Sequence, residues 1–249
     1  MKRPGRGMCV IGGDLHTAVQ TWTRADTHPI VLIGLSHVGE TDYYTAVGRI
    51  LDANLDAEVL HEGVVREQPP PALTARERDR LAHLDGWGLR RALEWAAVAT
   101  GLQLQSHGLV RREHWRNADV TAVDLLRVSG DLRDITLPDP DDLTWPQGRQ
   151  ARLAARLLRR LMIHGSRWTH LTANRSTRLG IIDWRNINAI IQVFRVVHDS
   201  PVLLLWGAGH LRGMGKLLAL NDFNLDNTRW LRAISARAPT MPDDQPADA

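Results

Sequence analysis

The stretch Pro201-Val-Leu-Leu-Leu-Trp-Gly-Ala-Gly-His-Leu-Arg-Gly213 decides the fold of this chain. Its residues Val202 to Leu205 form a short continuous apolar run. Such a run is typical of a strand that is buried on both faces, as in a parallel sheet covered by helices. Two glycines and then His210 come shortly after the run. Because ligands of open α/β sheets collect at the carboxyl ends of the strands, His210 is well placed for chemistry.

A second stretch, Pro29-Ile-Val-Leu-Ile-Gly-Leu-Ser-His37, repeats the same order of events. It contains a proline, an apolar strand, a glycine, two further residues and a histidine. We therefore expect His37 and His210 to meet at one end of one sheet. Since the two segments lie far apart in the sequence, a shared site favours a single domain.

The residues after His37 predict a strand–helix–strand unit. The spacing of apolar residues predicts a helix over Thr41 to Ala53, and Glu58 to Val65 is typical of the next strand. If the two strands are neighbours in a right-handed unit, the end of the second lies beside the end of the first. This places Glu62 close to His37.

The remaining patterns predict a central, mainly parallel sheet flanked by helices, in the α/β class or, alternatively, the α+β class. An N-terminal strand pair, Met8 to Gly13 and Thr17 to Thr23, turns at Gly12-Gly13-Asp14. Further helices are expected near Thr74 to Asp85, Leu89 to Thr100, Asp119 to Val128, Gly148 to His164 and Trp184 to His198, and a last strand at Thr228 to Ile234. We expect one domain over residues 1–235, an exposed loop over 130–147 and a disordered tail over 236–249.

Composition narrows the class of protein. The chain has 249 residues, a net charge of +3 and 24 % charged residues, which is ordinary for a soluble globular protein. Its single cysteine, Cys9, excludes an internal disulfide framework and a cysteine-based metal cluster. No apolar run approaches the ~20 residues of a membrane helix, and no apolar segment follows the basic start as in a secretory signal. We therefore expect a cytoplasmic protein without membrane insertion.

His37, Glu62 and His210 form the candidate site. Two imidazoles and one carboxylate make a three-ligand set for a divalent transition metal and leave positions open for water and substrate. Mn, Co and Zn all suit such a set, so the ion stays open. The alternative is that these are satisfied polar residues at strand ends. His61, the neighbour of Glu62, is expected to face the other side of the strand and to pack under a helix.

Arg185 and Asn186 lie at the first turn of the helix expected over Trp184 to His198. If that turn points at the site, Arg185 could stabilise an oxyanion that develops on a substrate carbonyl. The alternative is a surface arginine that pairs with Asp183, which contributes little.

Four segments resemble, in order and spacing, the signature of the TraB/PrgY superfamily, which includes the TIKI proteins. They are Ile33-Gly-Leu-Ser-His37-Val, Leu60-His-Glu62-Gly-Val, Trp184-Arg185-Asn186 and Trp206-Gly-Ala-Gly-His210-Leu-Arg-Gly. The resemblance implies a sheet covered by helices and a metal-dependent hydrolase site, with peptidase activity attributed to the TIKI branch. By position, it makes His37 and His210 metal ligands, Glu62 a ligand or general base, and Arg185 a contact to substrate.

The chain departs from that family at one place. The family usually has glutamate directly before the arginine, whereas this chain has Trp184, with Asp183 one residue further back. The leading hypothesis is a metal-dependent hydrolase of a small peptide or another amide or ester substrate. The alternative is a catalytically silent protein that binds a peptide or nucleic acid on the same scaffold. A homo-oligomer is compatible with the sequence.

The helix expected over Gly148 to His164 carries five arginines that are expected to face largely outward, namely Arg149, Arg152, Arg156, Arg159 and Arg160. Four apolar residues are expected to face inward, namely Leu153, Leu157, Leu161 and Met162. A row of arginines can bind phosphates, but it is more often a solvated helix face. Because the net charge is modest and no nucleic-acid-binding module is recognisable, we do not expect nucleic acid as the partner.

Overall fold

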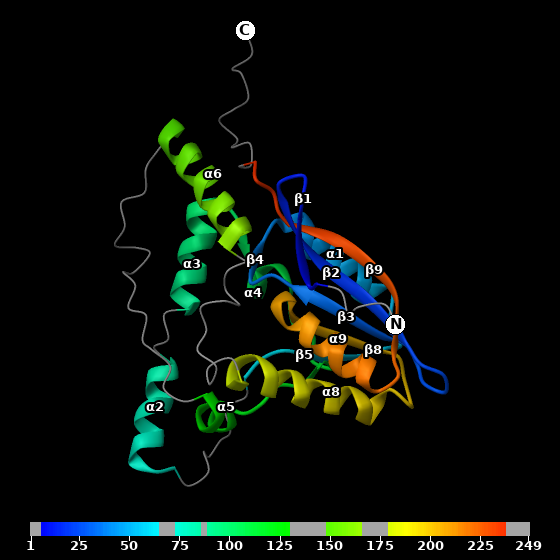
Figure 1. Ribbon diagram of the computed structural model, residues 1–249. Helices are drawn as coiled ribbons and strands as arrows, with labels where there is room; N and C mark the ends of the chain where they lie inside the picture. Colours follow the sequence, from blue (N-terminus) through cyan, green and yellow to red (C-terminus); the bar gives the residue numbers. More distant parts are fainter. Residues whose placement is uncertain (1–5, 65–72, 86–88, 130–147, 166–178, 238–249) are drawn as a thin grey trace.

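A central mixed sheet organises the computed structural model, which describes residues 6–64, 73–85, 89–129, 148–165 and 179–237 (Figure 1). In these residues the sheet has seven strands. Six lie in the order β1 (Met8–Ile11), β2 (Asp14–Thr23), β3 (Ile30–Leu35), β8 (Val202–Gly207), β5 (Glu58–His61) and β7 (Arg116–Asn117). The seventh, β9 (Asn224–Ile234), pairs with β2.

The sheet has a parallel part and an antiparallel part. β3, β8, β5 and β7 run parallel to one another, whereas β1, β3 and β9 all pair with β2 in the antiparallel direction. The N-terminal pair turns at Gly12 and Gly13, whose φ angles of 60° and 93° suit the two-residue turn that best matches the strand twist. The α/β class and the N-terminal strand pair are confirmed.

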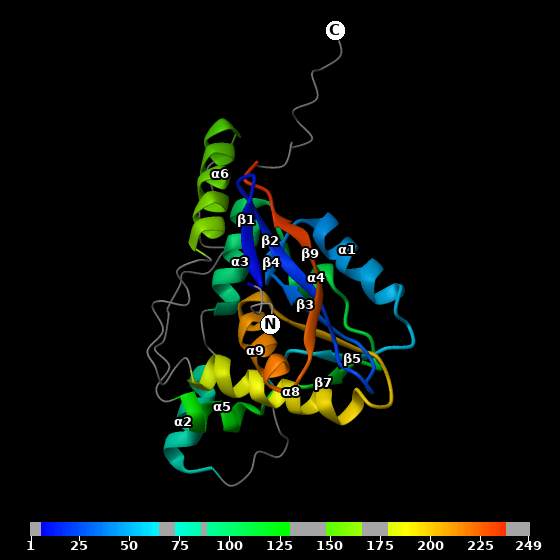
Figure 2. The ribbon, with the colours of Figure 1, turned by 45° about the vertical axis from the view of Figure 1, so that its right-hand side comes forward.

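Helices cover both faces of the sheet. α8 (Arg185–Val196) and α9 (Leu211–Leu220) pack against one face, and α1 (Thr41–Asp52) and α3 (Leu89–Thr100) cover the other. Figures 1 and 2 both show α8 and α9 side by side, away from α1. Alternate residues of β8 enter two separate cores because successive strand residues point to opposite faces. Leu203 and Leu205 join the core on the α1 side, and Leu204 and Trp206 join the core on the α8 side.

The remaining elements surround this sheet. They are α2 (Ala75–Asp85), α4 (Gln105–Gly108), α5 (Ala122–Ser129), α6 (Gly148–Gly165), the π-helix η2 (Leu179–Trp184), the 3-10 helix η3 (Ala208–His210), and a two-stranded sheet of β4 (Val38–Gly39) and β6 (Gln103–Leu104). α2 begins with a capping box, in which Thr74 and Glu77 bond reciprocally. The loop predicted over 130–147 and most of the predicted tail lie outside the described residues.

The predicted neighbourhood of β3 and β5 is wrong, because β8 lies between them. β8 pairs with β3 from Ile30↔Val202 onward and with β5 from Glu58↔Val202 onward. All six residues of β8 are buried, so its continuous apolar run is best satisfied at the centre of the parallel part. The segment that carries His210 therefore lies between the segments that carry His37 and Glu62.

The predicted orientation of α6 is also wrong. Leu153, Leu157 and Leu161 are 59 %, 60 % and 67 % exposed, whereas Arg159 is fully buried. The Arg159 guanidinium donates to a carboxylate oxygen of Glu40 at 2.6 Å and to three backbone carbonyl oxygens, those of Thr100, Ser235 and Arg237. A buried guanidinium requires such acceptors, and α6 turns so that Arg159 reaches them.

Within the ranges that the structure describes, no helix combines the length and the apolar character that a membrane crossing requires.

Candidate active site

The carboxyl ends of β3, β8 and β5 bring the predicted segments together. Leu35, the last residue of β3, pairs with Gly207, the last of β8, and His61, the last of β5, pairs with Leu205. The backbone N–H of Glu62 then donates to the carbonyl oxygen of Leu205 at 3.0 Å. The expectation that the His37 and His210 segments share one sheet edge is confirmed at the level of the strands.

Glu62 lies at the centre of this edge. One oxygen of its carboxylate, Oε1, accepts a hydrogen bond from Arg185 Nη2 at 2.6 Å, and the other, Oε2, accepts one from the backbone N–H of Gly207 at 2.5 Å. Burial raises the pKa of Glu62, but the charge of Arg185, the electrostatic interactions with His210 and His37 and the bond from Gly207 outweigh it and lower the pKa below its usual value. Glu62 is therefore an ionised carboxylate at neutral pH.

Arg185 joins Glu62 to a second carboxylate, Asp119. Its Nε and Nη2 atoms donate to the two Asp119 oxygens at 2.9 and 2.5 Å, a bidentate geometry, and its guanidinium lies 5.8 Å from the centre of the Trp206 ring. Burial alone would lower the pKa of Arg185, but Asp119 and Glu62 raise it, so the guanidinium stays charged. The pairing of Arg185 with Asp183 that the sequence left open is not the one formed.

Asn186, the next residue of α8, contacts His210. Its Oδ1 atom lies 2.7 Å from His210 Nδ1. Because an amide oxygen can only accept, Nδ1 carries the proton and the lone pair lies on Nε2. Burial, helped by Arg185 and His37 and opposed by Glu62 and Asp119, lowers the pKa of His210 to about 4. The imidazole is therefore neutral at physiological pH.

Two glycines allow these side chains to approach the backbone closely. A Cβ atom on Gly207 would stand 3.1 Å from Glu62 Oε2 and 3.5 Å from His210 Cδ2. A Cβ atom on Gly213, in α9, would stand 2.3 Å from Asn186 Nδ2, closer than packing permits. Gly207, at the end of β8, and Gly213, in α9, therefore make room for the site rather than only turning the chain.

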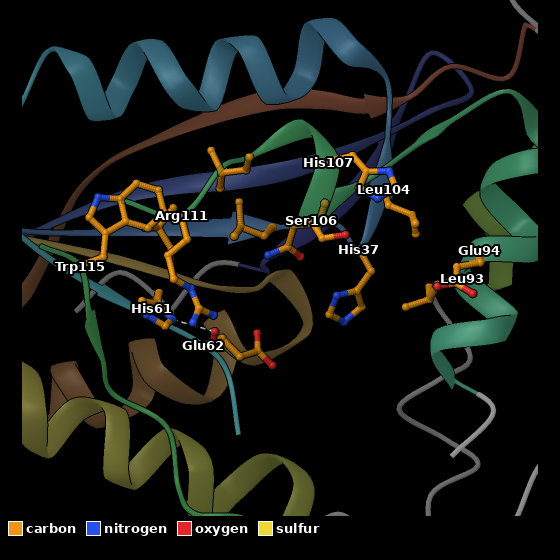
Figure 3. Close-up of a pocket in the computed structure, with 14 residues that line it drawn as sticks. His37, His61, Glu62, Leu93, Glu94, Leu104, Ser106, His107, Arg111 and Trp115 are labelled. Atoms are coloured by element: carbon orange, nitrogen blue, oxygen red, sulfur yellow. Dashed lines mark hydrogen bonds between the residues drawn. The ribbon is translucent and has the colours of Figure 1, made fainter. Parts of the chain in front are cut away.

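A cavity of ≈ 630 Å³ lies at the same strand ends, on the α1 side of the sheet. His37 and Glu62 line it, and Figure 3 shows both side chains pointing into it. Arg185, Asn186 and His210 belong to the α8 side and are not among the lining residues. Glu62 thus connects the cavity with the Arg185 and His210 cluster.

His61 also lines the cavity, so the prediction that it packs away from the site is wrong. β5 ends at His61, and its Nδ1 atom lies 2.9 Å from the carbonyl oxygen of Glu62. Strand alternation does send the two side chains to different faces. The cavity, however, lies across the strand end, where both can reach it.

The chemistry of His37, Glu62 and His210 suits a divalent metal ion. His210 is neutral with a free Nε2 atom, its other nitrogen is oriented by Asn186, and the Glu62 carboxylate is ionised and hydrogen-bonded, as metal ligands commonly are. The arrangement is incomplete. In the described part of the chain, no three or more histidine, cysteine, aspartate or glutamate side chains are grouped so that they could hold an ion.

Asp119 is the residue that sequence reasoning missed. It was assigned to a helix, but α5 begins only at Ala122, and Asp119 follows β7, which is parallel to β5. Its side chain accepts hydrogen bonds from the backbone N–H groups of Gly63 at 2.9 Å and Val120 at 2.8 Å as well as from Arg185. The available signal was an acidic residue just after a strand of the same parallel set, but a two-residue strand is too short to recognise from its pattern.

Comparison with known proteins adds no assignment: no family model, no curated protein and no solved structure matches this chain. The likeness to the TraB/PrgY superfamily therefore stays a prediction that rests on the four segments alone.

Proposed function

We propose that the chain is a hydrolase that acts on an amide or ester carbonyl of a peptide or another small substrate bound in the cavity. The observation that carries this proposal is the position of Glu62. Its ionised carboxylate lines the cavity and is also held by Arg185, beside the neutral imidazole of His210. Both groups are deprotonated at neutral pH, so either can accept a proton.

In the proposed reaction, Glu62 accepts a proton from a water molecule while the water oxygen adds to the carbonyl carbon. The carbon–nitrogen or carbon–oxygen bond then breaks, and the proton passes to the leaving amine or alcohol. Arg185 stabilises the negative charge in this region. Arg185 does not line the cavity, so it acts on the reaction through Glu62, whose carboxylate it keeps ionised.

A divalent transition metal, Mn, Co or Zn, belongs to this proposal as the ion that His37, Glu62 and His210 would hold. Such an ion lowers the pKa of a bound water. His37 is exposed at the cavity, so its side chain is the one with freedom to complete the set. His210 is already in the tautomer that presents Nε2.

The test combines elemental analysis with hydrolysis assays on protein purified without an affinity tag. We expect about one Mn, Co or Zn per chain after loading, and loss of that metal in His37→Ala and His210→Ala with the fold retained. His198→Ala is the matched control, because His198 is exposed at the end of α8 and outside the site. Metal binding that survives in both site variants would contradict the assignment.

The second candidate function is a catalytically silent binding protein. One observation favours it: Arg185 and Gly207 already bond to both oxygens of Glu62, so the carboxylate has hydrogen-bond partners without an ion. In this case the protein takes up no stoichiometric metal under any loading condition and hydrolyses no peptide or ester, yet binds a peptide. If nucleic acid is the ligand instead, its affinity must fall steeply with salt.

A further inference from the structure

Two consecutive arginines in the segment between α4 and β7 take different directions. Arg112 pairs with Asp52, an ion pair between side chains that are 37 % and 61 % exposed. Arg111 lines the cavity, and its guanidinium makes no hydrogen bond or ion pair to any described residue. Since arginines at such sites usually find a carboxylate, a free guanidinium beside a cavity indicates an anion that comes from outside the protein.

The head group of Arg111 lies close to Glu62. A Cβ atom on Gly63, the residue after Glu62, would stand 3.1 Å from Arg111 Nη2. Figure 3 shows the Arg111 side chain reaching from the Trp115 side of the cavity toward His61 and Glu62. Because consecutive Cα atoms are about 3.8 Å apart, a group bound by Arg111 lies only a few bonds from a carbonyl that is hydrolysed beside Glu62.

Arg111 makes no ion pair with either carboxylate that lines the cavity, Glu62 or Glu94. Glu62 pairs instead with Arg185, whose charge it shares with Asp119. The cavity walls include leucines from five segments (Leu35, Leu93, Leu104, Leu109 and Leu205). The cavity therefore combines one fixed cation with an apolar surface, the usual design of a small-molecule site.

We propose that Arg111 binds a carboxylate of the substrate, so that the site takes small amides or esters whose free carboxylate lies a few bonds from the carbonyl that is attacked. The end of a short peptide and an N-acyl amino acid both have this chemistry. Leucine side chains of the cavity contact the apolar part of the substrate. This inference names the substrate class of the proposed hydrolase and rests on that function, but the binding step can be measured without turnover.

The test uses isothermal titration calorimetry at fixed ionic strength with two probes, N-acetyl-leucine and N-acetyl-leucinamide, which differ only in the carboxylate. We expect wild type and Arg112→Met to bind the acid about 10- to 100-fold more tightly than the amide, the range for a charge-assisted bidentate contact. Arg111→Met removes this preference, and Arg111→Lys, which keeps the charge but not the planar fork, retains only part of it.

The inference is overturned if wild type shows no preference for the acid, including the case in which it binds neither probe, or if Arg111→Met keeps the preference. Product analysis of the same samples separates the two proposals. Selective binding without hydrolysis refutes the proposed activity and leaves the carboxylate site standing. Hydrolysis without any preference for the acid refutes the carboxylate site and leaves the activity standing.

Discussion

Replacement of Asp119 by asparagine tests the network that holds the site together. Each oxygen of Asp119 accepts two hydrogen bonds. Oδ1 accepts from Arg185 Nε at 2.9 Å and from the Val120 N–H at 2.8 Å, and Oδ2 accepts from Arg185 Nη2 at 2.5 Å and from the Gly63 N–H at 2.9 Å. The side chain is fully buried. Asp119→Asn keeps the shape but turns one acceptor into a donor.

The size of the effect follows from this count. Whichever way the amide is oriented, one charged and one neutral hydrogen bond are lost. A bond to a charged group contributes about 1.5–3 kcal/mol and a neutral one about 0.5–1.5 kcal/mol. We therefore expect Asp119→Asn to lower the free energy of unfolding by about 2 to 4.5 kcal/mol. The opposed N–H groups and the reduced compensation of the Arg185 charge favour the upper part of this range.

Asp52→Asn is the matched control, because Asp52 makes the same kind of ion pair, with Arg112, at the surface. We expect it to cost less than about 1 kcal/mol, since exposed ion pairs contribute little. Urea unfolding followed by circular dichroism and by tryptophan fluorescence measures both variants, and coincident transitions justify a two-state treatment. If Asp119→Asn shifts the urea midpoint no more than Asp52→Asn does, the Glu62–Arg185–Asp119 network is wrong.

Three further predictions concern the core and the site. Arg159→Leu should destabilise the fold by about 3–5 kcal/mol in urea unfolding, because it leaves a carboxylate and three carbonyls without their donor. Arg160→Leu, on the exposed side of α6, should cost less than about 0.5 kcal/mol. Equal costs would contradict the buried position of Arg159. The folded-state pKa of His210, about 4, lies below the unfolded value of about 6.5. The contribution of His210 to the free energy of unfolding is therefore complete above pH ~6.5 and is lost as the pH falls toward 4. An NMR titration that finds the imidazole charged at pH ~6 would refute this. Gly213→Ala should destabilise the fold, since the added Cβ atom collides with the side-chain amide of Asn186, which holds His210. Gly48→Ala in α1, where a Cβ atom meets nothing, should stabilise the fold by about 0.5–1 kcal/mol. Thermal unfolding that shows the same sign for both variants would count against the close approach at Gly213.

The sequence predicted much of the scaffold because its signals are local. The apolar runs of β3 and β8, the two-glycine turn after β1 and the reciprocal bonds between Thr74 and Glu77 each depend on a few neighbouring residues. For the same reason, the placement of Arg185 and Asn186 at the first turn of a helix was correct. The orientation of α6 was not, because one buried guanidinium outweighed a row of leucines.

The site itself depended on pairings between distant parts of the chain. The segment that ends in Glu62 was expected beside the His37 segment, but β8 lies between them. Glu62 was expected to serve a metal ion, whereas in the fold Arg185 and Gly207 contact both of its oxygens. Neither partner can be read from the residues around Glu62.

By itself, the sequence determined which segments become buried strands and which chemical groups follow them, because hydrophobic periodicity and turn chemistry act over a few residues. Only the tertiary structure decided that β8 lies between β3 and β5, that Asp119 and Glu62 share the charge of Arg185, and that Arg111 faces the cavity. The physical reason is that a buried charge must find its counter-charge wherever the fold supplies it, and that partner can be anywhere in the chain.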